Sequence, residues 1–252
     1  MSERIDTSVA THRPRILVMP DAPLADAHVA ERIAAYLARE SRPVLGLATG
    51  RTMVPVYAAL RERFVQGRLS FAEAESFNLD EYCGLLAEDP SSFASYMRRH
   101  LFDHVDMAPG RYHLPDPQAP DAFEAQIARA GGIGLQLLGI GRNGHIGFNE
   151  PGAARDSRTR IVRLEESTRR ANAGDFPQGA VLPTHAVTMG ISTILEARSI
   201  VLLAIGAGKA DSLARAFDGP VGPACPASFL QLHGDVTVVC DAAAASRLEE
   251  TT

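Results

Sequence analysis

Leu135-Gln-Leu-Leu-Gly-Ile-Gly-Arg-Asn-Gly-His145 begins as a short apolar run and continues as a glycine-rich loop. The apolar part has the length of a strand that is buried on both faces of a parallel sheet. Runs of the same kind recur at residues 16–19, 44–47, 135–138, 200–204 and 236–239. Each of these runs predicts a buried strand.

Segments with a helical pattern separate these runs. Their apolar residues recur at spacings of three and four, as on one face of a helix. The segments are residues 24–40, 54–64, 93–105, 122–130 and 209–217. The alternation predicts an α/β fold with three layers, in which a mostly parallel sheet carries helices on both faces. Sheets of this kind bind ligands at the carboxyl ends of their strands.

The chain shows no long linker, repeat or low-complexity tract, which indicates one domain over residues 15–252. Residues 1–14 are polar and unpatterned, and we expect them to form a flexible lead-in. Residues 155–183 are polar and rich in arginine, with weak periodicity. We expect this segment to be a mobile insertion or lid.

Composition excludes several classes of protein. The 252 residues are 46% hydrophobic and 22% charged, which is typical of a globular protein rather than a disordered or fibrous one. The net charge of −5 and the absence of a long basic run argue against nucleic acid and anionic membranes as partners. No apolar stretch approaches the roughly 20 residues that span a bilayer. The first residues also lack the features of a signal peptide, so we expect a cytoplasmic protein.

The cysteines do not form a recognisable site. Cys83, Cys225 and Cys240 are widely spaced and include no Cys-x-x-Cys pair. This pattern fits neither a disulfide framework nor a zinc site. We therefore interpret all three as free thiols and expect no bound metal.

Lys209 is the only lysine among 25 basic residues. Its place after Gly206-Ala-Gly208, at the predicted start of a helix, is unfavourable for the helix dipole. A compact ammonium group at such a position suggests an anionic ligand, because arginine serves elsewhere in this chain as the general cation. The alternative is an ordinary surface lysine.

Thr49-Gly50-Arg51-Thr52 follows a predicted strand and leads into a predicted helix. Such a turn presents backbone N–H groups and hydroxyls to an anion, so we expect a phosphate site. It is not a Walker motif, because no Gly-Lys-Thr or Gly-Lys-Ser follows at the required spacing. The alternative is a simple strand-to-helix turn capped by a threonine.

Asp80 and Glu81 are adjacent carboxylates just past a predicted strand. Neighbouring side chains in extended chain point to opposite sides, so we expect at most one of them to face a ligand. A carboxylate at this end of a strand is well placed to act as a general base. The alternative for either residue is a capping or solvated role.

The loop after residue 138 holds the densest set of chemical groups. It contains a literal Gly-x-Gly-x-x-Gly, but the following Gly147 and Pro151 would break the helix that a dinucleotide site requires. What remains is a loop that carries Asn143, His145 and Glu150. These groups suit proton transfer, because imidazole groups in general exchange protons near neutral pH, and Glu150 or Asn143 can fix the tautomer and orientation of His145.

Together these motifs resemble those of the glucosamine-6-phosphate deaminases, within the wider glucosamine-6-phosphate isomerase and 6-phosphogluconolactonase superfamily. The resemblance runs in order from residue 44 to residue 241. It rests on Thr49-Gly50-x-Thr52, Phe77-Asn-x-Asp80-Glu-Tyr82, Gly-His145-Ile-Gly-Phe-Asn-Glu150-Pro, Ser157-Arg-Thr-Arg160, Thr168-Arg-x-Ala-Asn172, Gly206-x-Gly-Lys209-Ala and Gln231-Leu-His233. Phe148-Asn-Glu150-Pro is its most specific element, because the related lactonases lack it. The resemblance implies a Rossmann-like form of the three-layer fold.

It also implies a reaction without cofactor or metal. His145, oriented by Glu150 and Asn143, would help to open the pyranose ring of glucosamine 6-phosphate. Asp80 would move the proton from C2 to C1, and ammonia would leave to give fructose 6-phosphate. The implied substrate-binding residues are Thr49, Gly50, Arg51, Thr52, Gly144 and Lys209. Backbone N–H groups of the loop from Gly141 to Gly144 would stabilise the anionic intermediate.

Three departures from the family pattern qualify these expectations. Asn143 stands where many members have aspartate, so a neutral amide would position His145 on that side. Arg51 and Met53 replace a small residue and a proline in the first loop. Gly174 stands where a phosphate-binding arginine is common, and we expect Arg51 to substitute for it.

Regulation is expected to be simple. Val162 stands where allosterically activated members have a lysine, and the chain ends without their C-terminal extension. We expect hyperbolic kinetics and a monomer or small homo-oligomer.

Other functions remain open from the sequence. They are a deaminase of another amino-sugar phosphate such as galactosamine 6-phosphate, a 6-phosphogluconolactonase, and a catalytically inactive sugar-phosphate sensor. The presence of Phe148-Asn-Glu150 argues against the lactonase, and the short lead-in offers no DNA-binding domain of a sensor. In every case the expected partner is a small sugar phosphate.

Overall fold

The computed structural model describes residues 11–249. The predicted lead-in, residues 1–14, therefore lies outside the described residues except for positions 11–14, where the backbone N–H of His12 donates to the carbonyl of Gln231.

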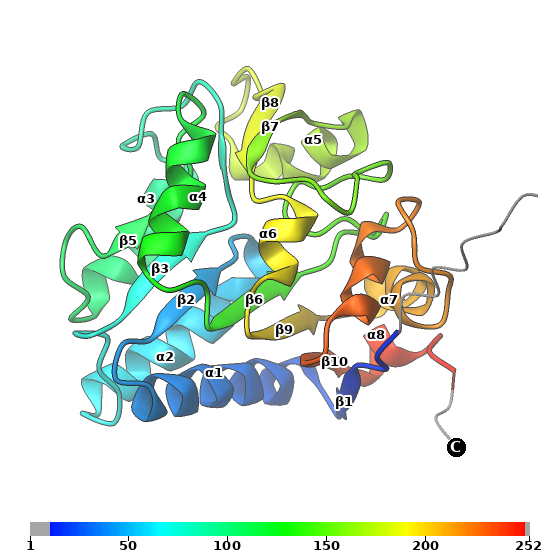
Figure 1. The fold of residues 1–252 in the computed structure, drawn as a ribbon, viewed down its shortest axis with the longest axis horizontal. Helices are drawn as coiled ribbons and strands as arrows, with labels where there is room; N and C mark the ends of the chain where they lie inside the picture. The colour runs from blue at the N-terminus through cyan, green and yellow to red at the C-terminus, as the bar shows by residue number, and fades with distance from the viewer. Residues whose placement is uncertain (1–10, 250–252) are drawn as a thin grey trace, which may run out of the picture.

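A seven-stranded sheet forms the centre of the molecule (Figure 1). All of its neighbouring strands pair in parallel. The strands are β1 (Arg15–Met19), β2 (Val44–Leu47), β3 (Glu75–Asn78), β5 (Tyr112–His113), β6 (Leu135–Gly139), β9 (Ser199–Ala204) and β10 (Val236–Asp241). The five predicted strands are among them, and the expectation of a mostly parallel sheet is confirmed.

The order of the strands creates a place for a ligand. Across the sheet they lie in the order β1-β10-β9-β6-β2-β3-β5. From β2 the chain moves outward to β3 and β5, then returns to β6 on the other side of β2 and continues through β9 and β10. The segments that leave β2 and β6 therefore diverge, and a crevice opens at the carboxyl ends of these strands.

Helices cover both faces of the sheet, with α1 and α2 on one side and α4 and α6 on the other (Figure 1). They begin and end close to the predicted boundaries where the apolar pattern is strong. Their bounds are α1 (Ala22–Arg39), α2 (Val54–Val65), α3 (Phe93–His100), α4 (Pro120–Arg129), α5 (Glu166–Asn172), α6 (Ile191–Leu195), α7 (Ala210–Phe217) and α8 (Ala242–Ala245). Short 3-10 turns occur at Arg51–Met53, Phe102–His104, Ala173–Asp175, Ala207–Lys209 and Pro226–Leu232.

One predicted helix is shorter than expected. The pattern over residues 93–105 suggested a single helix, but α3 ends at His100. Leu101 leaves the helical conformation, and a separate 3-10 turn follows it. Leu101 and Phe102 are both buried there, so burial of apolar side chains rather than helical periodicity accounts for the pattern.

The core strands are buried along almost their whole length, as expected of a parallel sheet with two covered faces. Close packing in this core restricts which residues fit. Gly46 in β2 lies against the buried Gln136 of β6, and a Cβ atom at this position would overlap the Gln136 side-chain amide. The glycine therefore makes room for a polar side chain inside the sheet.

A small antiparallel sheet stands beside the large one. It consists of β4 (Asp80–Tyr82), β8 (His185–Thr188) and β7 (Arg160–Arg163), in the order β4-β8-β7. Its core contains Tyr82, Phe148, Leu164 and Ala186. The chain passes from the large sheet to the small one at Leu79, directly before Asp80.

The segment predicted as an insertion or lid, residues 155–183, contains β7, α5 and the turn Ala173–Asp175. Arginines occupy both ends of β7, and its Ile161 is exposed, so the strand lacks an apolar alternation that the sequence could reveal.

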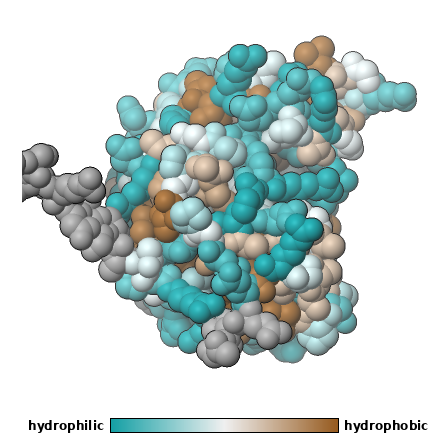
Figure 2. Space-filling model, turned by 90° about the vertical axis from the view of Figure 1, so that its right-hand side faces the viewer, coloured by the Kyte–Doolittle hydropathy of each residue, from teal (hydrophilic) through white to brown (hydrophobic). Residues whose placement is uncertain are grey.

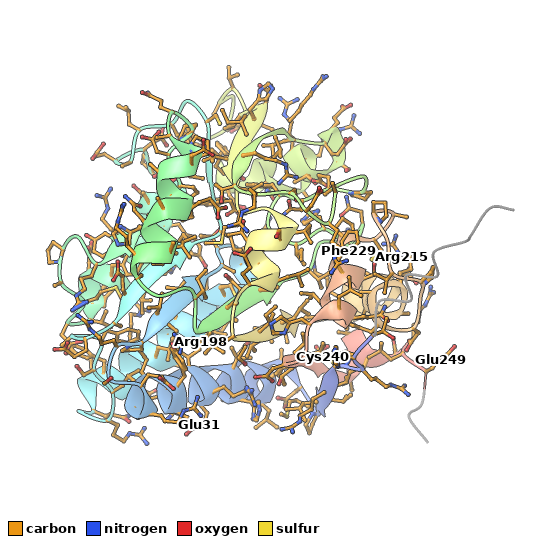
Figure 3. The ribbon with its side chains drawn as sticks, in the orientation of Figure 1. Glu31, Arg198, Arg215, Phe229, Cys240 and Glu249 are labelled. Carbon is orange, nitrogen blue, oxygen red and sulfur yellow. The ribbon has the colours of Figure 1, made fainter. Side chains whose placement is uncertain are left out.

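The face of the molecule in Figure 2 is mainly hydrophilic, with hydrophobic residues in separate small patches. The three cysteines are free, as expected, and Cys240 lies within β10 (Figure 3). Among residues 11–249 no helix has the length and apolar character to cross a membrane.

The packing at Gly46 generates a stability prediction. We expect Gly46→Ala to lower the free energy of unfolding by about 1–3 kcal/mol, because the new methyl group overpacks the Gln136 side chain. In a Gln136→Ala background the same substitution should cost less than about 0.5 kcal/mol. Denaturant unfolding of the four proteins measures both values, and equal costs in the two backgrounds would contradict this interpretation.

Candidate active site

A cavity of about 190 Å³ lies at the carboxyl ends of the strands, where the order of the sheet reverses. Residues from segments far apart in the sequence line it. They are Ala48, Thr49, Gly50, Thr52, Met53, Leu79, Asp80, Tyr82, Phe93, Gly139, Ile140, Gly141, His145, Gly147, Phe148, Asn172, Asp175, Leu203 and Lys209. The crevice thus unites the Thr-Gly turn, the Asp-Glu pair, the histidine loop and the lysine turn.

Asp80 and Glu81 point in different directions, as the sequence predicted. The Asp80 carboxyl lines the cavity, whereas Glu81 accepts hydrogen bonds from the backbone N–H groups of Phe93 and Ala94, at 2.9 and 2.8 Å. These groups belong to the first turn of α3, which has no intrahelical partners for them. Glu81 therefore anchors α3 to β4, and Asp80 is the carboxyl that faces a ligand.

Asp80 is buried in an unfavourable setting for a charge. Within residues 11–249 no group donates a hydrogen bond to its side-chain carboxyl, and only 6% of the residue is exposed. Burial, and then repulsion by the neighbouring Glu81 carboxylate, raises the pKa of Asp80 to about 8. A carboxyl group with such a pKa can both accept and donate a proton near neutral pH.

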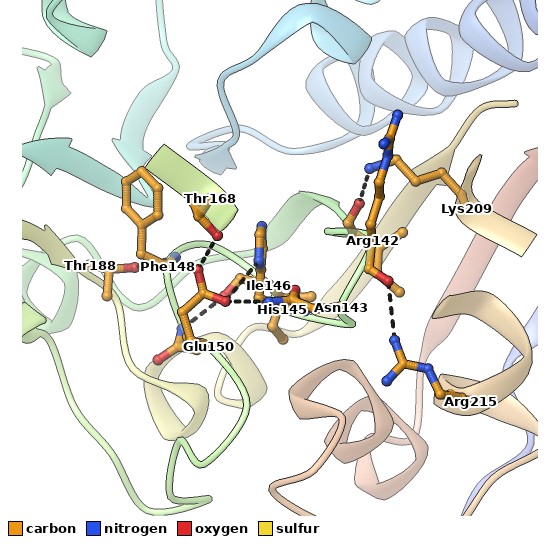
Figure 4. Close-up of polar contacts among 12 residues, drawn as sticks. Arg142, Asn143, His145, Ile146, Phe148, Glu150, Thr168, Thr188, Lys209 and Arg215 are labelled. Carbon is orange, nitrogen blue, oxygen red and sulfur yellow. Dashed lines mark hydrogen bonds and ion pairs between the residues drawn. The ribbon is translucent and has the colours of Figure 1, made fainter. Parts of the chain in front are cut away.

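His145, which also lines the cavity, belongs to a hydrogen-bonded group (Figure 4). Its Nδ1 lies 3.2 Å from Glu150 Oε2, and Asn143 Nδ2 donates to the same oxygen at 2.6 Å. Asn143 Oδ1 accepts from the backbone N–H of His145 at 3.2 Å. The amide of Asn143 therefore acts on the imidazole through Glu150 rather than by touching the ring.

Glu150 has the opposite electrostatic setting to Asp80. Burial alone would raise its pKa, but hydrogen bonds from His145, Thr168 and Asn143, with the charge of His145, hold the pKa below its ordinary value. An ionised Glu150 favours a proton on Nδ1 of His145, so that Nε2 is the unprotonated nitrogen of the neutral ring. The ring lies against Gly141, where a Cβ atom would overlap it.

Gly147 shapes the wall between these two groups. Its φ of +56° suits glycine, and a Cβ there would come within 2.9 Å of Thr188 Oγ1 and 3.5 Å of Asp80 Oδ2. The absence of a side chain keeps the space beside Asp80 open.

Thr49, Gly50 and Thr52 of the first loop and Lys209 of the lysine turn all line the cavity. Lys209 Nζ donates to the carbonyl of Ile140 at 2.6 Å. Burial, and then the charge of Arg142, lowers the pKa of Lys209. An ammonium group has three donors, so the remaining two can bind an anion beside the hydroxyls of the threonines.

Arg51 is not part of the cavity lining, although its neighbours Gly50 and Thr52 are. Its guanidinium donates to the carbonyl of Ala171 at 3.2 Å and lies 3.4 Å from the carboxylate of Asp175. A Cβ atom on Gly174 would come within 3.8 Å of Arg51 Nη2. The guanidinium thus occupies the neighbourhood of the position where the family commonly has an arginine.

Gly144, expected from the resemblance to contact substrate, is placed differently. It does not line the cavity, and its N–H and C=O groups pair with Gly141 and Ala227. A Cβ there would overlap the Cys225 sulfur. Since the N–H of Gly141 also pairs, with the carbonyl of His145, neither glycine N–H is available to stabilise an anionic intermediate. Their role is to shape the loop.

Several residues that complete the site had no role predicted from the sequence. Thr168 donates to Glu150 Oε1, and Asn172 Nδ2 donates to the Tyr82 hydroxyl at 3.0 Å. Asp241, at the end of β10, accepts from the N–H of Gly206 at 3.0 Å and so holds the turn that carries Lys209. These contacts join elements distant in sequence, and only their presence in or beside motifs could have drawn attention to them.

The arrangement suits acid–base chemistry on a small anionic molecule. A protonatable carboxyl, an oriented imidazole, a cation and two hydroxyl side chains all line one cavity. Among the residues that the structure describes, no three His, Cys, Asp or Glu side chains gather as metal ligands do.

Comparison with known proteins places this chain in a family. The model of the family described as glucosamine-6-phosphate isomerases/6-phosphogluconolactonase matches residues 22–239. The chain belongs to this isomerase/lactonase family.

Two members of the isomerase/lactonase family are especially similar. A glucosamine-6-phosphate deaminase from Rhodopirellula baltica is 52% identical over 241 residues, which cover 93% of this chain and 96% of the relative. A solved structure of a monomeric glucosamine-6-phosphate deaminase is 40% identical, with a TM-score of 0.90 over 92% of this chain and 99% of that one.

More distant solved structures share the fold of this chain. The 6-phosphogluconolactonase from Trypanosoma cruzi has a TM-score of 0.77 over 96% of this chain and all of that one, at 19% identity. At this identity the likeness shows a shared fold alone.

The raised pKa of Asp80 generates a stability prediction with a definite sign. Between the ordinary pKa of 3.8 and the folded-state pKa of about 8, the folded protein binds a proton that the unfolded chain releases. Ionisation of this buried group therefore costs stability increasingly as pH rises to about 8. Asp80→Asn removes the cost, so we expect its melting temperature to exceed that of the wild type by roughly 5 °C or more at pH 8.5. At pH 4.5 the difference should be small, and a variant equally or less stable at both pH values would contradict the assigned pKa.

Proposed function

We propose that this protein is a glucosamine-6-phosphate deaminase, an isomerising enzyme that converts glucosamine 6-phosphate and water to fructose 6-phosphate and ammonia. The observation that carries the proposal is the cavity that the buried Asp80 carboxyl, the Glu150-bound His145 and Lys209 all line. The deaminase from Rhodopirellula baltica, at 52% identity, supports the same activity.

In the proposed first step His145 helps to open the sugar ring. Its Nε2 serves as the site of proton transfer between the O1 hydroxyl and the ring oxygen, since Glu150 accepts the hydrogen bond of Nδ1. The ring oxygen gains a proton, O1 loses one, and the C1 aldehyde forms. Glu150 stabilises the imidazolium that arises during this transfer.

In the next step Asp80 removes the proton from C2 of the open-chain sugar. The electrons pass to O1, which takes a proton from the C2 ammonium group, and an enol with a neutral amino group on C2 results. Asp80 returns its proton to C1, and the nitrogen lone pair forms a protonated imine at C2. Addition of water to this imine then releases ammonia and leaves the C2 ketone of fructose 6-phosphate. Asp80 acts as base and then as acid, which its pKa of about 8 permits.

The substrate itself favours the ionised form of Asp80. In the free enzyme near neutral pH, the raised pKa keeps most of this carboxyl protonated. The 2-amino group of the substrate enters as a cation, and a positive charge close to a carboxyl lowers its pKa. Binding an amino sugar would thus generate the base that the reaction needs.

The phosphate group would bind to Thr49, Gly50, Thr52 and Lys209, with Arg51 as an additional cation. A Gly50 φ of +100° gives the turn the shape in which its backbone approaches a ligand. We expect the enzyme to need no metal or cofactor, to be cytoplasmic, and to act as a monomer or small homo-oligomer. The monomeric deaminase of the same family supports the last point.

The decisive activity measurement is release of ammonia and fructose 6-phosphate from glucosamine 6-phosphate. We expect equal amounts of both from the wild type, and a loss of at least about 100-fold in kcat for Asp80→Asn, because the base is removed. Asp121→Asn, an exposed position in α4, serves as the matched control and should retain activity. Folded wild-type protein that releases no ammonia would overturn the proposal, and hydrolysis of 6-phosphogluconolactone would then be tested.

The same assay separates the epimers. Galactosamine 6-phosphate offered beside the gluco substrate gives a ratio of kcat/KM values, and we expect the gluco substrate to be preferred. A ratio in favour of the galacto epimer would assign the alternative substrate.

The place of Arg51 generates a prediction about substrate affinity. We expect Arg51→Ala to raise KM about tenfold with little change in kcat, because a charged hydrogen bond to the phosphate is lost. Asp175→Asn breaks the ion pair with Arg51 and leaves the guanidinium in place, although it also changes one residue of the cavity lining, so it separates loss of the pair from loss of the cation. An Arg51→Ala variant with the wild-type KM would refute phosphate binding, and an equal rise in both variants would indicate that Arg51 only holds the neighbouring turn.

A further inference from the structure

The two carboxylate oxygens of Glu150 accept hydrogen bonds from different parts of the chain. Oε2 accepts from Asn143 and His145, which belong to the same loop as Glu150. Oε1 accepts from the Thr168 hydroxyl, which comes from α5 (Figure 4). Among the described residues, Thr168 is the only donor to Oε1. The loop that carries His145 is thus completed by one residue from a separate element.

Both members of this contact are shielded from water, with Thr168 5% and Glu150 9% exposed. Water can therefore replace a lost hydroxyl only poorly, and a buried carboxylate without one of its donors is disfavoured in its charged form. The carboxylate would also be free to turn about its last torsion, because only Oε2 would remain bonded. Either change weakens the hold on His145 Nδ1.

The position of Thr168 depends on how α5 packs. The helix is tied to the cavity at its C-terminal end, where Asn172 donates to the Tyr82 hydroxyl and Arg51 donates to the carbonyl of Ala171. Thr168 lies one turn before these contacts, on the face directed toward Glu150. Its hydroxyl therefore reaches Glu150 because α5 is seated against the cavity wall.

We propose that Thr168 is a positioning residue of this enzyme, whose hydroxyl keeps Glu150 ionised and oriented so that His145 presents Nε2 to the sugar ring. Thr168 is not part of the cavity lining, so it acts through Glu150 and not on the substrate. Its effect on the reaction rests on the proposed deaminase function, whereas its effect on Glu150 is a property of the free protein.

The kinetic test compares Thr168→Val with Thr168→Ser. Valine has the shape of threonine without the hydroxyl, and serine keeps the hydroxyl. We expect Thr168→Val to lower kcat about tenfold with KM changed less than twofold, and Thr168→Ser to recover most of the rate. Ser167→Ala, an exposed neighbour in α5, should match the wild type.

An open-chain substrate mimic separates positioning from a general disturbance of the site. The probe is the amino alcohol phosphate formed by reducing C1 of the substrate, which cannot cyclise and so needs no ring opening. Because Thr168 does not touch the ligand, the inhibition constant of the amino alcohol phosphate should change less than twofold in Thr168→Val. Parallel losses of mimic binding and kcat would show that the substitution only loosens α5, and would overturn the proposal.

A measurement without substrate tests the link itself. Titration of the Glu150 side-chain carboxyl by ¹³C NMR, assigned with Glu150→Gln, should give a higher pKa in Thr168→Val than in the wild type or Thr168→Ser. An unchanged pKa together with wild-type kcat would overturn the role of Thr168. A raised pKa in a protein that releases no ammonia would leave the link to Glu150 standing and refute the proposed reaction instead.

Discussion

The chemistry of this site depends on the different surroundings of two adjacent carboxyl groups. Asp80 and Glu81 begin β4, at the point where the chain leaves the large sheet for the small one. Glu81 is satisfied by the free N–H groups at the start of α3. Asp80 receives no such donors within residues 11–249 and is left beside that negative charge in a buried cavity wall. The contacts that fix α3 therefore also create an acid whose pKa lies in the range useful for proton transfer.

A second carboxylate, behind the cavity-lining His145, has the reverse environment. Glu150 is also buried, but three hydrogen-bond donors from the loop and from α5 favour its charged form. Burial and the charge of Glu81 thus raise the pKa of Asp80, whereas hydrogen bonds and the charge of His145 outweigh burial at Glu150. Different environments assign acid and base roles to paired carboxyl groups in many enzymes. The protonatable one meets the ligand, and the ionised one orients His145.

Those parts of the fold that depend on local pattern could be predicted from the sequence. The buried strands read as apolar runs, and α1, α2 and α4 showed their periodicity because each packs one face on the core. The strand β7 could not be predicted, since arginines flank it and its Ile161 faces outward. For the site, Thr49, Asp80, His145 and Lys209 could be grouped from the sequence, because parallel sheets bind ligands at the carboxyl ends of their strands. The hydrogen bonds of Thr168 and Asp241 depend on tertiary contacts that no spacing encodes. The N–H groups of Gly141 and Gly144 are occupied by carbonyls of their own loop, a turn geometry that the glycine spacing alone did not reveal.

The proposed acid–base chemistry depends on the pKa of Asp80 in the folded protein. Its most direct test is the titration of the Asp80 carboxyl carbon by ¹³C NMR, with the resonance assigned by its loss in Asp80→Asn. Burial beside Glu81 predicts a midpoint near pH 8. Addition of glucosamine 6-phosphate to a variant unable to open the ring, such as His145→Ala, should move the midpoint downward because the ammonium group binds nearby. A midpoint close to the ordinary value of 3.8 in the free protein would contradict the account.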